Sequence, residues 1–356
     1  MDMLQQPGQA VLGRALVGRN FVNPLFDYLL IGGGLSLFVI GFVLMNPLGS
    51  GFISTETLPY FFLASNSAHF AASTVRLYTK PGAFQSLPYV TMGLPVIAIA
   101  VLIGCMFQAD RLAPQLTSLY LTWSPFHYAA QAYGLSVMYC YRSGCTLGEQ
   151  NKKLLWRVAM LPFIYNFVFA GNVGLHWLDY GGWLANPTAQ TFLYYFKFVM
   201  PVLAFGGIAY LCWRIAKTEK QVMPAISGLI LLTNALWWFL FPPLEAFVWA
   251  TIFHGIQYLA IVIIFHVREQ LALPENHHSR TYHICWFYGA CILLGYGLFH
   301  CFPRAFIFIG FGPVESVLLV VAVINIHHFI VDAFIWRLRK TDSNRKIVES
   351  VVAVPA

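Results

Sequence analysis

Apolar residues follow one another along this chain in long blocks, and short polar stretches containing Pro and Gly separate the blocks. An α-helix needs about 20 apolar residues to cross the hydrocarbon core of a membrane, and Pro and Gly are the residues that most often end helices. The pattern predicts ten membrane-spanning helices, at residues 26–45, 59–78, 88–107, 115–140, 154–173, 191–213, 223–242, 246–267, 282–302 and 313–337.

Composition supports a membrane protein. Of the 356 residues 58% are hydrophobic and only 10% are charged, with a mean hydropathy of +0.66. A soluble domain carries about 25% charged residues. We therefore expect an all-α, polytopic integral membrane bundle, in an inner (plasma) membrane of bacterial type. The expected layout is a cytoplasmic segment at 1–25, a transmembrane domain at 26–338 and a cytoplasmic tail at 339–356. No cleavable signal peptide and no internal repeat are evident.

The basic residues orient these helices. With the ten helices in place, 18 of the 21 Lys and Arg residues fall on one side, in loops or at the adjoining helix ends. These are Arg14, Arg19, Arg76, Lys80, Arg142, Lys152, Lys153, Arg157, Arg214, Lys217, Lys220, Arg268, Arg280, Arg337, Arg339, Lys340, Arg345 and Lys346. Cytoplasmic loops of membrane proteins are enriched in Lys and Arg. The partition predicts that both termini are cytoplasmic, and it explains the net charge of +7 without a nucleic-acid partner.

Histidines recur in the helices that are predicted to run from outside to inside. They are His69, His127, His254 and the pair His327–His328. At 1.5 Å of rise per residue their depths agree within about 9 Å, so we expect them to meet in one layer near the bilayer midplane. A single histidine in a membrane helix can equally well hold a neighbouring helix by a hydrogen bond. That structural interpretation is the one we apply to the other six histidines (His176, His266, His277, His278, His283 and His300).

Polar residues accompany these histidines at helical spacing. Residues three or four positions apart share one side of a helix, and a metal-bound histidine usually donates its second ring proton to an amide, carboxylate or carbonyl. The residues predicted to support the histidines are Asn66, Ser73, Gln131, Gln257, Asn325 and Asp332. Asp332 has a second possible role, as the partner of Arg76. Tyr258, four residues after His254, and Asp332 are the candidate catalytic groups.

The types of residue in this layer limit its chemistry. Imidazole suits Zn, Cu, Fe and Ni. The seven cysteines form no CxxC pair and are expected to pack as small apolar residues. The Glu-rich pattern of carboxylate-bridged di-iron bundles is absent. These features favour a mononuclear, all-histidine site for Fe(II), with copper possible and haem less favoured. A b-type cytochrome and a proton or metal-ion transporter remain alternatives that would use the same histidines.

Four histidine stretches resemble the Brp/Blh family of membrane β-carotene-cleaving dioxygenases. They are AHFAAS at His69, FHYAAQ at His127, FHGIQYL at His254 and INIHHFIVDAFIW from His327 to Asp332. The resemblance implies a metal-dependent dioxygenase, and it favours His327 as the ligand of the last stretch because His327 lies five residues before an Asp. Gln257 and Tyr258 stand where the family's third stretch has a second histidine.

Together these features predict a membrane-embedded, metal-dependent oxidoreductase or oxygenase. Its predicted ligands are His69, His127, His254 and His327 or His328, and its expected co-substrate is O₂. Access to a midplane site is easiest from the lipid, so the expected substrate is hydrophobic, such as an isoprenoid or an acyl chain. The identity of the substrate and the oligomeric state are left open.

Overall fold

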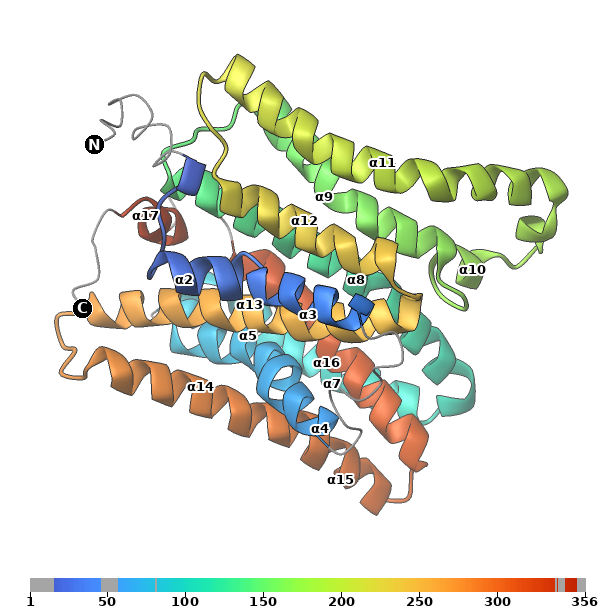
Figure 1. The fold of residues 1–356 in the computed structure, drawn as a ribbon. Helices are drawn as coiled ribbons and strands as arrows, with labels where there is room; N and C mark the ends of the chain where they lie inside the picture. The colour runs from blue at the N-terminus through green and yellow to red at the C-terminus, as the bar shows by residue number, and fades with distance from the viewer. Residues whose placement is uncertain (1–15, 46–56, 81, 337, 339–342, 351–356) are drawn as a thin grey trace, which may run out of the picture. The chain divides into compact units, whose positions relative to one another are not determined.

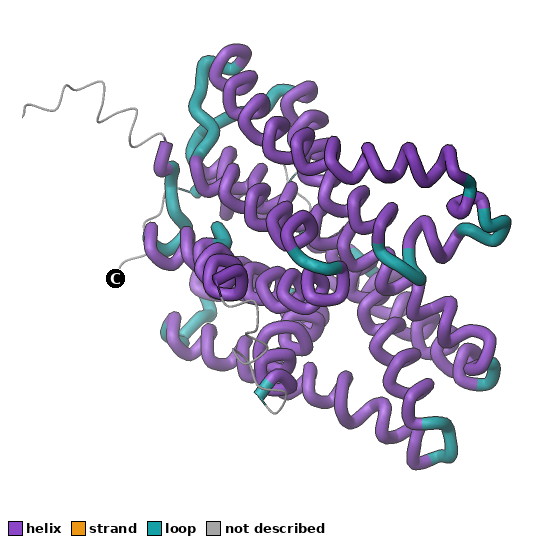
Figure 2. The backbone as a smooth tube through the Cα atoms, turned by 45° about the vertical axis from the view of Figure 1, so that its right-hand side comes forward, coloured by secondary structure: helices purple, strands orange, loops and turns teal. Residues whose placement is uncertain are grey.

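The computed structural model describes residues 16–45, 57–80, 82–336, 338 and 343–350. Within these residues the chain consists of helices and loops, without a strand (Figures 1 and 2). The described residues form two compact units. The first unit comprises residues from 1–45, 125–250 and 346–356, and the second comprises residues from 46–124 and 251–345. Three helices, α8 (Ala109–Arg142), α13 (Pro243–Leu271) and α17 (Ser343–Glu349), contribute residues to both units.

The first unit contains the start of the chain, the end of α8 and the long helices of the middle. Its elements are α2 (Pro24–Phe26), η1 (Asp27–Ile31), α3 (Gly34–Met45), α9 (Glu149–Phe169), α10 (Gly174–Leu178), η4 (Trp183–Ala185), α11 (Pro187–Thr218), α12 (Ala225–Leu240) and the end of α17 (Ser343–Glu349). Helix α11 packs on α9 and on α12. Asn186 caps α11 by accepting a hydrogen bond from Thr188 N, and Pro187 fills its first position.

The second unit contains the remaining elements. They are α4 (Leu58–Phe61), η2 (Phe62–Ser67), α5 (Ala68–Thr79), α6 (Ala83–Ser86), η3 (Tyr89–Gly93), α7 (Leu94–Met106), the start of α8, most of α13, α14 (Arg280–Tyr296), η5 (Gly297–Cys301), α15 (Phe302–Phe308) and α16 (Pro313–Ile335). Helix α5 packs against α14 and α16, and α16 also packs against α7 and α15 (Figure 1).

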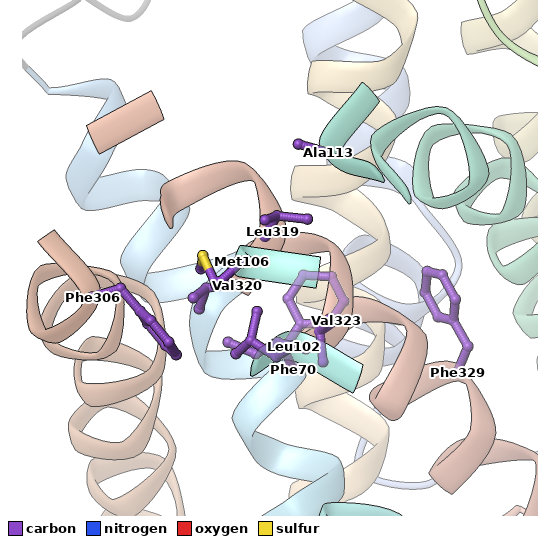
Figure 3. Close-up of a cluster of buried hydrophobic side chains, with 10 residues drawn as sticks. Phe70, Leu102, Met106, Ala113, Phe306, Leu319, Val320, Val323 and Phe329 are labelled. Carbon is purple, nitrogen blue, oxygen red and sulfur yellow. The ribbon is translucent and has the colours of Figure 1, made fainter. Parts of the chain in front are cut away.

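A hydrophobic core lies between helices of the second unit (Figure 3). Phe70 of α5, Leu102 of α7 and Leu319 of α16 are buried in it, and Phe306 of α15 and Phe329 of α16 extend it. Phe70 directly follows His69, so this core holds the part of α5 that carries the histidine.

Each of the ten segments predicted as helices is helical over most of its length, and residue 337 of the last one lies outside the described residues. Five of them are long and apolar enough to cross a membrane: Tyr89–Met106, Pro187–Thr218, Pro243–Leu271, Arg280–Phe308 and Pro313–Ile335. A sixth is the pair Pro24–Ile31 and Gly34–Met45, which is bent by 53°. The bend follows Gly33, whose φ of 86° favours glycine. An all-α fold with helices suited to a membrane is confirmed, whereas ten crossings and cytoplasmic termini stay predictions.

Short π-helical turns interrupt several helices, namely η1, η2, η3 and η5. Such turns occur frequently at functional sites, where they change the direction of the side chains that follow. The turn η2 ends at Ser67, two residues before His69. The start of α5, and with it the direction of His69, therefore depends on this irregular turn, which a simple helical periodicity does not predict.

Candidate metal centre

Three of the predicted histidines meet in the second unit. His69 lies near the start of α5, His254 in the middle of α13 and His328 in the last part of α16, and all three are buried. Each offers one ring nitrogen, and these nitrogens lie within 4.8 Å of one another. The prediction that histidines of helices far apart in the sequence meet in one cluster, which could hold a metal ion, is confirmed for these three.

The rings are packed edge to face. The Nε2 atoms of His69 and His254 are 3.2 Å apart. The centroid of the His69 ring is 4.7 Å from that of His254 and 4.5 Å from that of His328, with interplanar angles of 90° and 81°. We refer to His69, His254 and His328 as the histidine cluster.

Ser73 orients His328 from the neighbouring helix. Its Oγ lies 2.8 Å from His328 Nδ1 and also 3.0 Å from the carbonyl oxygen of Phe70, to which its hydroxyl donates. A hydroxyl that donates to Phe70 accepts from the Nδ1–H group of His328. In that tautomer the lone pair of His328 lies on Nε2, which is the form that a metal-ligating histidine takes.

Asp332 and Tyr258 complete the polar groups beside His328. Asp332 Oδ2 lies 3.4 Å from His328 Nε2, and Asp332 Oδ1 accepts a hydrogen bond of 2.6 Å from the Tyr258 hydroxyl. The Tyr258 oxygen in turn accepts a hydrogen bond of 3.2 Å from Trp336 Nε1. Both residues that the sequence singled out as catalytic candidates are thus adjacent to the cluster, and they are bonded to each other.

Ser73, Tyr258 and Asp332 share one position relative to the cluster. Each lies four residues, about one turn, after the cluster histidine of its own helix. Their contacts run between helices, because Ser73 of α5 bonds His328 of α16 and Tyr258 of α13 bonds Asp332. Further along α5 and α16, Arg76 contacts Trp336. The contacts therefore advance in the same direction along α5, α13 and α16, so these three helices run parallel to one another.

Beyond this layer lies a buried ion pair. Arg76 of α5 is almost fully buried and bonds both carboxylate oxygens of Glu269, at 3.0 and 3.2 Å. Its Nη2 also donates to Asn344 Oδ1 at 3.0 Å, and its guanidinium group lies 4.9 Å from the centroid of a Trp336 ring. The sequence offered Asp332 two roles, as a partner of a histidine or as a partner of Arg76. In the structure Arg76 forms its ion pair with Glu269, and Asp332 lies beside His328.

The remaining predicted residues occupy other positions. His327 lies beside His328 on α16 but outside the cluster, so the geometry favours His328 as the ligand of this stretch. Asn325 donates through Nδ2 to Val321 O at 2.7 Å. The side-chain oxygens of Asn66 and Asn325 are buried and have no hydrogen-bond partner among the described residues. Gln257 lies half-buried on α13.

His127 and Gln131 belong to the part of α8 that lies in the first unit. His127 is buried, and its ring lies 6.4 Å from that of Tyr128. The predicted role of His127 as a ligand, and that of Gln131 as its support, stay predictions. Sequence reasoning also missed Trp336, whose indole nitrogen bonds Tyr258; the only signal was its spacing of four residues from Asp332.

The chain matches no protein-family model, and no curated protein or solved structure shows significant similarity to it. The resemblance to the Brp/Blh family therefore rests only on the four histidine stretches.

Proposed function

We propose that this chain is a membrane-embedded, non-haem metal-dependent oxidoreductase, in particular an oxygenase of a hydrophobic substrate. The observation that carries the proposal is the separation of 3.2 Å between the Nε2 atoms of His69 and His254, with His328 beside them. Two nitrogens that bind one metal ion at about 2.0–2.1 Å on adjacent positions lie about 3 Å apart. His69 and His254 therefore already have the spacing that two ligands of one ion require.

The same distance argues against His69 and His254 as the two axial ligands of a haem. The two axial ligands of a haem iron bind on opposite sides, so bonds of about 2.0–2.1 Å would hold their nitrogens about 4 Å apart with a porphyrin between them. His69 and His254 are closer than that, and their rings are in direct contact. The non-haem alternative has this geometric support, and the transporter alternative has no comparable observation behind it.

The type of donor is compatible with iron. Three imidazoles suit Zn, Cu, Fe and Ni better than a hard cation, and among these metals we propose iron because the proposed reaction uses O₂. Bound Fe(II) would supply the one-electron chemistry that O₂ requires. His127 is the further ligand that the sequence predicts.

The protein's own residues would hold and orient this centre. Ser73 fixes the ring of His328, and the Asp332 carboxylate, held by Tyr258, favours positive charge next to His328 Nε2. The buried position of the cluster excludes bulk water. Apolar helices surround the site, so a lipid-soluble substrate such as an isoprenoid or an acyl chain would reach it more readily than a polar one. The resemblance to carotenoid-cleaving enzymes agrees with that class of substrate.

Metal analysis of the purified protein tests the proposal. We expect about one iron per chain by mass spectrometry and no Soret band in the visible spectrum. His254→Ala should lose the metal while the protein still inserts and purifies. His277→Ala, a histidine of the loop before α14, is the matched control and should keep it. A strong Soret band, or equal metal content in both variants, would overturn the proposal.

A further inference from the structure

A second candidate site lies in the first unit. It is a cavity of about 270 Å³ at the start of α9, and none of the cluster histidines contributes to it. Its lining consists of one tyrosine of α8 and five residues of α9: Tyr133, Glu149, Lys152, Lys153, Trp156 and Arg157. Its volume is near the lower end of the range of about 300–1,000 Å³ that is typical of small-molecule pockets.

The cavity has excess positive charge. Of its three cationic groups, Lys152 is paired, because its Nζ lies 2.9 Å from Glu149 Oε1. The hydrogen bond from Lys152 lowers the pKa of Glu149, so this acid is ionised at neutral pH and offsets one positive charge. Lys153 and Arg157 form no hydrogen bond or ion pair with any other described residue. The cavity therefore contains the neutral pair of Lys152 and Glu149 and two further positive charges, on the exposed side chains of Lys153 and Arg157.

Arg214, a nearby arginine, differs from Arg157 because its side chain is bonded within the protein. Arg214 of α11 bonds the side chains of Asn151, Gln150 and Tyr210 at 2.9, 2.8 and 3.3 Å. Its donors are used within the protein and tie α11 to the start of α9. The donors of Arg157, only two turns further along α9, have no such use and are available to a ligand.

Aromatic side chains form the apolar wall of the cavity. Tyr133 and Trp156 meet edge to face, with ring centroids 5.1 Å apart and an interplanar angle of 89°. Trp156 is 36% exposed, and so is Ile164, which lies two turns further along the same helix. Trp and Tyr concentrate where a membrane meets water, and Lys and Arg place their charged ends at the same level.

We propose that this cavity binds a phosphate-bearing anion, seated as the headgroup of an anionic phospholipid. Arginine and lysine are the residues that most often bind phosphate, and basic pockets between membrane helices bind anionic headgroups. Lys153 and Arg157 would bind the phosphate, Lys152 would shift from Glu149 toward it, and the Tyr133 hydroxyl would donate a hydrogen bond. The acyl chains would lie along the exposed apolar side chains of α9. This proposal is independent of the metal centre.

Native mass spectrometry of the full chain tests it. The detergent-purified protein is incubated with equal amounts of phosphatidylglycerol and phosphatidylcholine, and the retained lipids are counted. We expect the wild type to retain phosphatidylglycerol preferentially. A basic residue that faces a bound anionic headgroup contributes roughly fivefold to such binding, so Lys153→Gln should lower the preference about fivefold and the double variant with Arg157→Gln further.

Lys217→Gln is the matched control. Lys217 lies on α11 of the same unit, beside the ring of Trp213 at 4.9 Å, and does not line the cavity. Its replacement removes the same charge and should change the preference less than twofold. The thermal unfolding of all variants is measured alongside. Because Lys153 and Arg157 are exposed and form no bonds within the described chain, their replacement should leave the unfolding temperature unchanged.

A parallel calorimetric titration with inorganic phosphate separates the two sources of the anion. Phosphate binding that the double variant loses, without preference for phosphatidylglycerol, would assign the site to a free anion. Retention of phosphatidylglycerol that only the cavity variants lose would assign it to lipid. If neither phosphatidylglycerol nor phosphate binds, or if Lys217→Gln loses as much as Lys153→Gln, the proposal is wrong.

Discussion

Gly255 holds α13 close to the turn that positions His69, and its replacement by alanine gives the sharpest test of how packing supports the histidine cluster. A methyl group at Gly255 would lie 2.9 Å from Ser65 O and 3.1 Å from Ser65 C. These are backbone atoms of η2, which cannot rotate away as a side chain can. Ordinary contact begins near 3.4 Å, so α13 and η2 must separate by about 0.5 Å.

This separation acts directly on the cluster, because Gly255 adjoins His254 and η2 precedes His69. Overpacking of this size costs about 1–3 kcal/mol of stability. The Nε2 atoms of His69 and His254, now 3.2 Å apart, would separate by up to about 0.5 Å, away from the spacing of about 3 Å that adjacent ligands of one ion require. Loss of support for metal ligands typically costs about 10- to 100-fold in affinity. We expect Gly255→Ala to bind metal at least about tenfold more weakly, in titrations of the apoprotein followed by thermal unfolding.

The control is Gly289→Ala on α14. A methyl group there would meet no atom within 4 Å, and alanine favours a helix by up to about 1 kcal/mol over glycine. This variant should be as stable as the wild type or more stable, with unchanged metal affinity. If Gly255→Ala binds metal as tightly as Gly289→Ala does, the close approach of α13 to η2 does not support the cluster and the reasoning is refuted.

Three further predictions follow from the contacts around the cluster. Asp332→Asn keeps the shape of the side chain but removes its charge beside His328, and should weaken metal binding about 10- to 100-fold in the same titration; unchanged affinity would assign Asp332 a purely structural role. His328→Ala should abolish metal binding, whereas His327→Ala should largely preserve it, and the reverse result would show that the neighbouring histidine is the ligand. Glu269→Gln leaves the buried Arg76 without its counter-charge and should lower the free energy of unfolding by about 3–5 kcal/mol, measured by denaturant titration. An effect below about 1 kcal/mol would mean that Asn344 and solvent are sufficient partners for Arg76.

The positions of the helices could be predicted from the sequence because apolar blocks separated by Pro and Gly allow few alternatives. Each of the ten predicted segments is helical, with boundaries that differ by a few residues, as at α13, which begins at Pro243 rather than residue 246. The π-helical turns could not be predicted, because they change the register of a helix without leaving a mark in its composition. Gly33 at the bend packs closely against α12, where a methyl group would clash with Thr233, and such a tertiary contact is not visible in the sequence.

The meeting of His69, His254 and His328 could be predicted because matched depth in parallel helices needs only topology and rise per residue. The sequence could not predict which side chain supports which histidine, because this depends on the rotation of each helix about its axis. Ser73 was expected to support His69, on its own helix, and the structure places it against His328. The choice between His327 and His328 as the ligand also depends on the rotation of the helix, because adjacent helical residues point about 100° apart. The residues around them are apolar on all sides of the helix, so the sequence does not indicate which of the two faces the cluster.

X-ray absorption at the iron edge of the iron-loaded protein tests the central claim most directly, since it reads the atoms around the metal rather than its presence. The account predicts nitrogen neighbours at about 2.0–2.2 Å with the outer-shell scattering of at least three imidazole rings, and loss of one ring's contribution in His328→Ala. A first shell of oxygen or sulfur without imidazole scattering, or a spectrum that His328→Ala leaves unchanged, would show that the histidine cluster does not hold the metal.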